Sequence, residues 1–242
     1  MRLADSPLFA YFRSTRPGDK RFLALVPLTG IVTGLAAVVL VRALAVVQKL
    51  FWGSGRDLLD QALAMSWAHR LLAPLLGGAV VGFIILATRA PVRGHGTAGI
   101  IEAIAKHRGA LPLRSSLIKA GATLVTVGSG GSLGREAPLV RVGAALSSLL
   151  GRRFHLTGNR LNILVACGAA AGIAAAYNAP IGGAMFALEV ILGNFALESF
   201  GPIVVAAALG TLVSRGFMGN YRAYSPPAYV PLVSGWELVT TS

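Results

Sequence analysis

The chain has 242 residues, of which 55% are apolar and only 13% are charged, and its mean hydropathy is +0.69. Soluble proteins carry roughly 25% charged residues, so this composition excludes an ordinary soluble domain, and the apolar content also excludes intrinsic disorder. The net charge of +13 lies mainly between long apolar runs, which favours membrane topology and a small anionic partner over nucleic acid. We therefore expect an all-α, polytopic membrane protein.

The N-terminal segment, residues 1–21, is predicted to contain an amphipathic surface helix around residues 7–13. Its basic residues outnumber its acidic ones. An excess of Lys and Arg marks the cytoplasmic side of a bilayer. We therefore expect the protein in the cell (inner) membrane, in contact with the lipid bilayer throughout and with its N-terminus in the cytoplasm.

Two uncharged runs follow, at residues 22–41 and 71–88, and each is long enough to cross about 30 Å of hydrocarbon as a helix. The first contains Gly30 and Gly34, and the second contains Gly78 and Gly82. Glycines spaced in this way let neighbouring membrane helices approach closely. Both pairs are therefore predicted to be packing faces.

Beyond residue 89 the sequence predicts short helices separated by Gly-rich and Pro-containing breaks. They cover residues 97–105, 114–127, 134–150, 161–177, 181–195 and 201–217. The segment Asn178-Ala179-Pro180 is a break because proline disfavours helix at the residue before it and opens the next helix. Irregular backbone at membrane depth is tolerated only where protein buries it or a wet cavity borders it, so these breaks predict a transport pathway. Residues 218–242 contain no spanning run and are predicted to be a connecting tail.

The stretch 128–138 carries the most informative chemistry, with the sequence Gly-Ser-Gly-Gly-Ser-Leu-Gly-Arg-Glu-Ala-Pro. A helix is predicted to start within its last five residues, and the free N–H groups at a helix start favour an anion. Glu136 falls in that first turn. It is either a carboxylate that merely stabilises the helix start or a functional group, since ionisable residues within membranes commonly mark ion or proton pathways. In the functional interpretation, Glu136 occupies the donors of a permeant anion and releases them when it is protonated.

Three motifs resemble those of the CLC family of chloride channels and chloride–proton antiporters. Gly134-Arg135-Glu136-Ala137-Pro138 resembles the family's Gly-Arg-Glu-Gly-Pro motif, and residues 168–183 resemble its long alanine-rich signature ending in Asn-Ala-Pro and a glycine pair. Gly94-His95-Gly96-Thr97-Ala98 falls where the family has Gly-Ser-Gly-Ile-Pro. The resemblance covers about residues 22–217. It implies the CLC chloride channel fold, with this region as the first of two inverted-topology halves built from short, broken and tilted helices.

The resemblance also implies roles for individual residues. Glu136 matches the gating and proton-handling glutamate. Anion binding is expected at Gly94, His95, Gly96, Gly134, Arg135, Glu136 and Ala137. His95 replaces the family's serine and can still donate from a ring nitrogen, which predicts an altered selectivity or pH response. Ala137 replaces a glycine and is expected to tune the site, and Ala98 replaces the family's proline.

A possible inner proton site is implied at Glu189 and Val190, which align with a paired acidic site of the family. The second position is an inner proton-transfer glutamate in many antiporters, and here it is Val190. This favours channel-like conduction over tight proton coupling. Glu189 is either a substitute proton site or a structural helix-end carboxylate paired with a basic group.

The family builds its pore from two halves, and the motifs of the second half have no match in this sequence. We therefore expect transport of chloride or a similar small anion that is incomplete without that half. The expected assembly is a homodimer or a pairing with the missing C-terminal half. The alternative is a non-conducting half-protein, or a truncated fragment, that packs with a full-length CLC subunit.

Other function classes fit the sequence less well. Gly128-Ser129-Gly130 resembles the surroundings of an intramembrane protease serine, but the four histidines fall in predicted loops or at helix edges, where none can activate it. The glycine-rich loop lacks the Lys-Ser/Thr pair of a nucleotide-binding loop, and a different secondary transporter would not share all three motifs. Cys167 is the single cysteine, so the sequence predicts no internal disulfide and no zinc site. We expect no enzyme activity, no metal and no cofactor.

Overall fold

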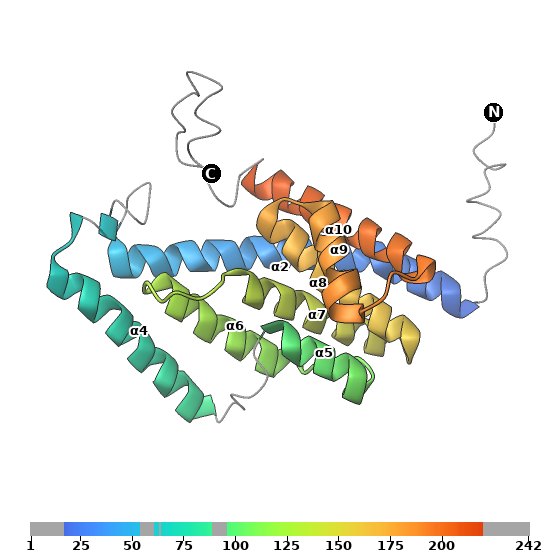
Figure 1. The fold of residues 1–242 in the computed structure, drawn as a ribbon, viewed down its shortest axis with the longest axis horizontal. Coiled ribbons are helices and arrows are strands. Elements are labelled where there is room, and N and C mark those ends of the chain that lie inside the picture. Colours follow the sequence, from blue (N-terminus) through green and yellow to red (C-terminus); the bar gives the residue numbers. More distant parts are fainter. Residues whose placement is uncertain (1–16, 54–60, 63, 89–95, 220–242) are drawn as a thin grey trace, which may run out of the picture.

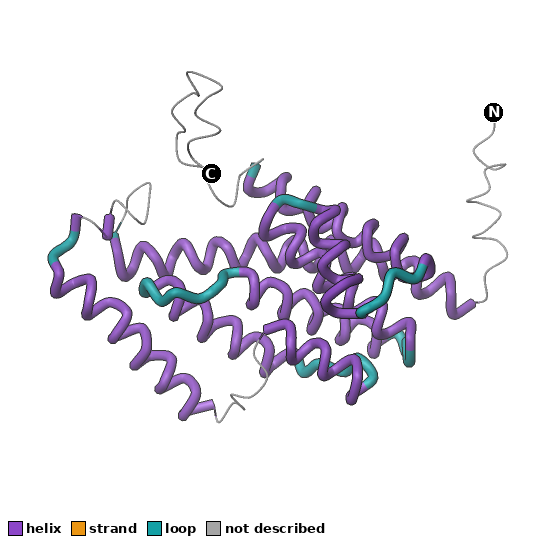
Figure 2. The backbone as a smooth tube through the Cα atoms, in the orientation of Figure 1, coloured by secondary structure: helices purple, strands orange, loops and turns teal. Residues whose placement is uncertain are grey.

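The computed structural model describes residues 17–53, 61–62, 64–88 and 96–219, and the regular elements of these residues are helices (Figures 1 and 2). In chain order the main helices are α2 (Pro17–Trp52), α4 (Trp67–Thr88), α5 (Gly96–His107), α6 (Leu113–Gly128), α7 (Glu136–Arg153), α8 (Asn159–Tyr177), α9 (Pro180–Phe186), the π-helix η2 (Ala187–Leu192) and α10 (Leu197–Met218). The predicted surface helix at residues 7–13 and the tail beyond residue 219 lie outside the described residues.

Within the described residues, four helices are long and apolar enough to cross a membrane: Lys20–Trp52 of α2, together with α4, α8 and α10. The chain is thus a multi-pass, all-helical membrane protein. Helix α2 has 36 residues and extends beyond the predicted run 22–41 at both ends, so residues 17–21 are helical and continuous with it. Hydropathy marks only the apolar middle of this helix, whose backbone hydrogen bonding continues through the charged Arg42 and Lys49.

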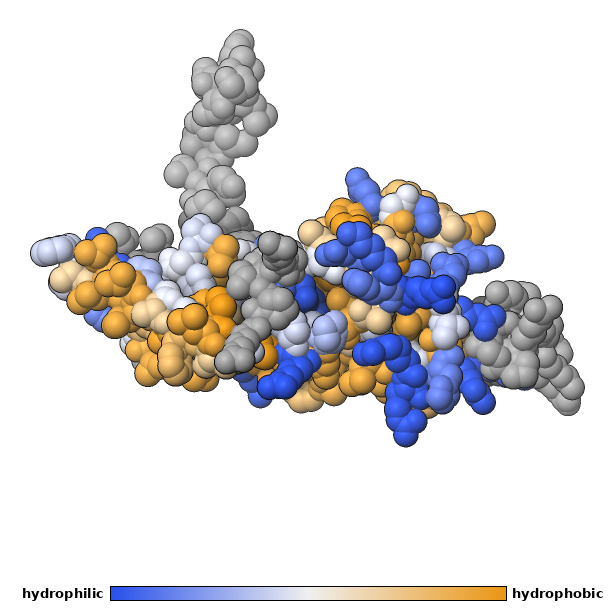
Figure 3. All heavy atoms as spheres, turned by 90° about the horizontal axis from the view of Figure 1, so that it is seen from below, coloured by the Kyte–Doolittle hydropathy of each residue, from blue (hydrophilic) through white to orange (hydrophobic). Residues whose placement is uncertain are grey.

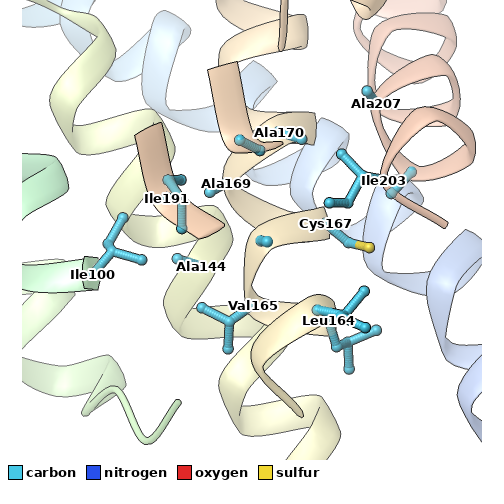
Figure 4. Close-up of a cluster of buried hydrophobic side chains, with 14 of the residues drawn as sticks. Ile100, Ala144, Leu164, Val165, Cys167, Ala169, Ala170, Ile191, Ile203 and Ala207 are labelled. Carbon is cyan, nitrogen blue, oxygen red and sulfur yellow. The ribbon is translucent and has the colours of Figure 1, made fainter. Parts of the chain in front are cut away.

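Helix α8 lies at the centre of the bundle, and α7, α10 and α2 pack around it (Figure 1). Most of its side chains are buried, and many are alanine or glycine, so the neighbouring backbones approach closely. Figure 4 shows part of the resulting core, to which α5, α7, α8, η2 and α10 all contribute. The residues labelled there are Ile100, Ala144, Leu164, Val165, Cys167, Ala169, Ala170, Ile191, Ile203 and Ala207.

The first predicted glycine pair is a packing face, as expected. A Cβ at Gly30 would lie 2.6 Å from the backbone oxygen of Ala206, and a Cβ at Gly34 would lie 2.8 Å from that of Gly210, both on α10. No described residue lies against Gly78 or Gly82, because a Cβ at either position would meet nothing within 4 Å, so this pair stays a predicted packing face. The spacing of two glycines defines a smooth helix face but not whether a neighbour covers it.

Helix α4 packs on α6 and diverges from the rest of the bundle (Figure 1). The face that it presents to the surroundings is apolar, and Figure 3 shows hydrophobic surface over this end of the molecule. The large exposed side chains of α4 are Trp67, Leu71, Leu72, Leu75, Leu76, Val80, Phe83 and Leu86. Such a face is stable in lipid, where apolar side chains need no cover from protein.

Two predicted helix boundaries need correction near the motifs. Helix α7 begins at Glu136 rather than Gly134, so residues 129–135 form the loop between α6 and α7. The single helix predicted at 181–195 is two elements, α9 and η2, and it stops at Gly193. Gly193 has φ +65, a left-handed conformation that commonly ends helices and that glycine adopts without strain.

Candidate functional site

The glycine-rich loop between α6 and α7 is held in place by Trp52 at the end of α2. The Trp52 indole nitrogen Nε1 donates a 3.0 Å hydrogen bond to the carbonyl oxygen of Gly128. The indole ring lies against Gly130, where a Cβ would come within 2.8 Å of Cζ2 and where φ is +102. The Gly131 N–H donates a 2.8 Å hydrogen bond to the carbonyl oxygen of Thr126. Trp52, which lies 76 residues before Gly128 in the sequence, therefore positions the loop that precedes α7.

Glu136 is the first residue of α7, and its two carboxylate oxygens have different surroundings. The Tyr177 hydroxyl donates a 2.5 Å hydrogen bond to Oε1. Oε2 is buried without a hydrogen-bond partner among the described residues. It lies over Gly134, where a Cβ would be only 2.6 Å away. An incompletely satisfied, buried carboxylate oxygen is energetically unfavourable, so an anion or a proton can compete for this position.

Glu136 and Tyr177 face a cavity of about 450 Å³. Its described lining residues are Thr97, Glu136, Ala137, Val140, Ile173, Tyr177, Ala179, Gly182, Gly183 and Phe186. The first turns of α5, α7 and α9 all contribute to this wall. Helix N-termini offer free N–H groups and the positive ends of helix dipoles, so their convergence favours an anion without a basic side chain in the wall. The apolar remainder of the wall weakens solvent screening.

The Asn178-Ala179-Pro180 break aims α9 at this cavity. Asn178 ends α8 in a left-handed conformation with φ 58, and Pro180 opens α9. Arg215 of α10 donates from Nε to the side-chain oxygen of Asn178, and from Nη2 to its carbonyl oxygen at 3.5 Å. The guanidinium offsets the negative end of the α8 dipole, which would otherwise oppose an anion beside Tyr177.

The other predicted anion-site residues are only partly brought together. Gly96 opens α5, and a Cβ there would lie 3.9 Å from that of Ala137, so two of the three motifs meet. Gly94 and His95 lie outside the described residues, and the role of His95 stays a prediction. The Arg135 side chain lines a separate cleft against Leu40 and Leu44 of α2, so its nearness to Glu136 in sequence does not make it part of the cavity wall.

The predicted inner proton site is separate from this cavity. Glu189 and Val190 lie in η2, roughly 14 Å along the helix axis from the start of α9, and neither lines the cavity. Both side chains are exposed. No ion pair joins Glu189 to a basic group in the part of the chain that the structure describes, so the predicted structural pairing is not observed there.

Three residues of these cavities are not predicted from the sequence. The sequence predicts Tyr177 only as the end of the helix at residues 161–177, and nothing in it indicates the contact with Glu136. Lys119 and Arg141 line a second cavity, beside Gly134 and Ala137. The sequence does contain a signal for both, because each is an ionisable residue flanked by apolar or small residues within its helix.

Comparisons with known proteins find relatives of this chain. Residues 77–241 match the family model described as voltage gated chloride channel. A putative chloride channel protein, ClcB-like, from Ralstonia nicotianae is 37% identical over 222 residues, which cover 90% of this chain and 52% of the relative. The voltage-gated ClC-type chloride channel ClcB of Escherichia coli O139:H28 is 33% identical over 198 residues, covering 81% of this chain and 47% of the relative.

The fold has a solved counterpart in the crystal structure of a slow cyanobacterial Cl⁻/H⁺ antiporter. The TM-score is 0.66 at 25% identity, and the match covers 94% of this chain and 53% of that one. The chain therefore spans about half the length of the curated relatives and of the solved structure that it matches.

Proposed function

The chain belongs to the voltage gated chloride channel (CLC) family, and from this membership we propose that it contributes one half of a pathway for chloride or a similar small anion, gated by Glu136. The observation that carries the proposal is the Glu136 carboxylate at a convergence of helix N-termini. Tyr177 binds one of its oxygens, and the other has no hydrogen-bond partner among the described residues. An ionised Glu136 competes with the permeant anion for the same donors. Protonation, or displacement by a second anion, vacates the position.

The proposed transport is channel-like. Val190 cannot carry a proton, and Glu189 lies outside the cavity that holds Glu136, so a continuous proton path between the two glutamates has no support from the described residues. Gly96 and Ala137 support the proposed anion site through the adjoining starts of α5 and α7. Gly94, His95, Gly134 and Arg135 complete the proposed set, with Gly134 and Arg135 acting through their backbone groups.

A second half is proposed to complete the pathway, either as a homodimeric arrangement of full subunits or through a complementary C-terminal half. Ile181, Met185 and Val190 are large apolar side chains that α9 and η2 leave exposed, and Ile181, next to the cavity-lining Gly182, is 74% exposed. We place the protein in the inner membrane with its N-terminus in the cytoplasm, because basic residues dominate the first 21 residues. Its role is transport rather than enzymatic catalysis.

Chloride efflux from proteoliposomes tests the proposal. The wild-type chain, Glu136→Gln and the matched control Glu189→Gln are each reconstituted together with the complementary half and compared at acidic and neutral pH. Glu136→Gln should remove the pH dependence of efflux, because a neutral amide can neither titrate nor compete as an anion. Glu189→Gln should behave as the wild type, without stoichiometric proton movement. A pH dependence that survives in Glu136→Gln contradicts the proposal.

A second candidate is the non-conducting half-protein that packs with a full-length CLC subunit. The exposed apolar surface of α9 and η2 beside the cavity favours it, since such a surface suits a protein partner as well as lipid. Absence of efflux from every variant, together with co-purification with a full-length relative, is the result that it predicts.

A further inference from the structure

We propose that the end of the bundle where α5, α6, α7 and α8 meet binds the headgroup of an anionic phospholipid from the surrounding membrane. The arginines of this surface are Arg108, Arg114, Arg152 and Arg153, and all four side chains are exposed. Figure 3 shows more hydrophilic surface toward this end of the molecule than over α4. The proposal goes beyond the proposed function and does not depend on the gate.

Hydrogen bonds hold the turn between α5 and α6 against the end of α7. The Ser148 hydroxyl donates to the carbonyl oxygen of Gly109 at 2.7 Å, and the Leu111 N–H donates to the Ser148 hydroxyl at 2.9 Å. Arg152 donates from Nη2 to the carbonyl oxygen of Leu111 at 3.3 Å. Arg108 directly precedes Gly109 in this turn, so the packing brings Arg108 and Arg152 to one surface.

The start of α8 lies against the same turn. A Cβ at Gly109 would come within 2.9 Å of the Asn162 side-chain oxygen in the first turn of α8. Arg114 is the second residue of α6, and Arg153 is the last residue of α7. Four helix ends therefore meet here, and segments far apart in the sequence contribute the arginines.

The surface carries a net positive charge. Glu102 and Glu136 are the only carboxylates between residues 96 and 188, and Glu136 lies at the other end of α7, roughly 24 Å from Arg152 along the helix axis. Glu102 pairs with Lys106 at 3.3 Å, so the Lys106 charge is already offset. Clusters of basic side chains beside the ends of membrane helices attract anionic lipid headgroups.

The start of α6 also favours a negatively charged ligand. Its first turn has no acidic residue but contains Arg114, and its N-cap, Pro112, makes no side-chain capping hydrogen bond. A cation at this place is unfavourable on its own, because the positive end of the helix dipole lies beside it. A phosphate group next to Arg114 offsets both positive charges at once.

Exposed leucines one helical turn deeper favour a lipid over a soluble phosphate. Leu149 lies three and four residues before Arg152 and Arg153, so it shares their face of α7. Leu117 lies three residues after Arg114 on α6. Leu149 is 43% exposed and Leu117 is 48% exposed. The acyl chains of a phospholipid cover such side chains while its phosphate binds the guanidinium groups, which a soluble phosphate ester cannot do.

Lipid binding to the full chain in detergent tests the proposal without measuring transport. Phosphatidylglycerol with a fluorescent acyl chain is titrated with the protein, and anisotropy gives its affinity. Phosphatidylcholine with the same acyl chains is the uncharged comparison, and it should bind about 10-fold more weakly or worse. The difference should shrink as salt is added, because salt screens exposed charges.

Double substitutions separate this surface from the overall charge of the protein. Arg114→Gln combined with Arg153→Gln should weaken phosphatidylglycerol binding by about 25-fold, or about 5-fold for each charge. The matched control is Arg42→Gln combined with Lys49→Gln, which also removes two exposed positive charges but from the other half of α2. The control should leave the affinity unchanged.

Each outcome decides for or against the proposal. Selective binding of phosphatidylglycerol that is weakened by the Arg114 and Arg153 substitutions, and not by the control, supports it. Unchanged affinity in that variant overturns it, and so does an equal loss in the control, because the overall charge would then be the cause. Displacement of the lipid by an equal concentration of glycerol phosphate also overturns it, since the ligand would then be a soluble phosphate. Should the double variant fail to fold, Arg153→Gln alone decides, with a loss of about 5-fold.

Discussion

Replacing Gly134 with alanine is expected to dislodge Glu136 from its position over the start of α7. A Cβ at Gly134 would lie 2.6 Å from Oε2 and 2.9 Å from Cδ of Glu136. Ordinary van der Waals contact begins near 3.4 Å, so the carboxylate must move by about 0.8 Å or adopt another rotamer. Gly134 is not among the glycines with positive φ, so alanine suits its backbone and the flexible glutamate is the group that yields.

The magnitude follows from the hydrogen bond that this displacement breaks. A hydrogen bond to a charged group contributes about 1.5–3 kcal/mol, and about 1.4 kcal/mol corresponds to a factor of ten. Loss of the bond from Tyr177 should therefore weaken the competing carboxylate and raise anion affinity in the Glu136 cavity by roughly 10-fold to 150-fold.

Titration calorimetry with bromide at neutral pH measures the effect. Gly121→Ala is the matched control, because a Cβ at Gly121 of α6 would meet nothing within 4 Å. Combining Gly134→Ala with Glu136→Ala provides a double-mutant cycle, in which the added alanine should have no effect once the carboxylate is absent. Wild-type affinity in Gly134→Ala, or an increase that persists in the Glu136→Ala background, would refute the reasoning.

Three further substitutions probe the site and its support. Tyr177→Phe removes only the donor to Glu136 and should raise bromide affinity by about 10-fold, with a loss of stability no larger than the about 1.5–3 kcal/mol of that hydrogen bond. A decrease in bromide affinity would make Tyr177 an anion ligand instead. Gly34→Ala should destabilise the α2–α10 contact by about 1–3 kcal/mol in thermal unfolding, because the added Cβ would clash with the Gly210 backbone. The control Gly82→Ala should not lower stability, because its Cβ would contact no described residue. Trp52→Phe should cost about 1–3 kcal/mol in the same assay, since it orphans the buried carbonyl of Gly128; no loss would mean that Trp52 does not hold the loop.

The sequence by itself determined that this protein lies in a membrane and which segments carry its candidate functional residues. Few charges and long apolar runs require a membrane, and these patterns are local, so the positions of α4, α6, α8 and α10 were predicted to within a few residues. The glycine-rich stretch before Glu136 and the Asn178 to Pro180 break were equally visible, because helix starts and stops depend on the conformational limits of individual residues.

The tertiary structure decided which of these local features face one another. Gly30 and Gly34 pack closely on α10, while no residue of the described ranges lies against the identically spaced Gly78 and Gly82, since a pattern specifies a helix face but not its neighbour. Tyr177 reaches Glu136, and Lys119 meets Arg141, only because α6, α7 and α8 lie against one another. Contacts between residues far apart in the chain depend on the packing of whole helices, and no periodicity within a single helix contains that information.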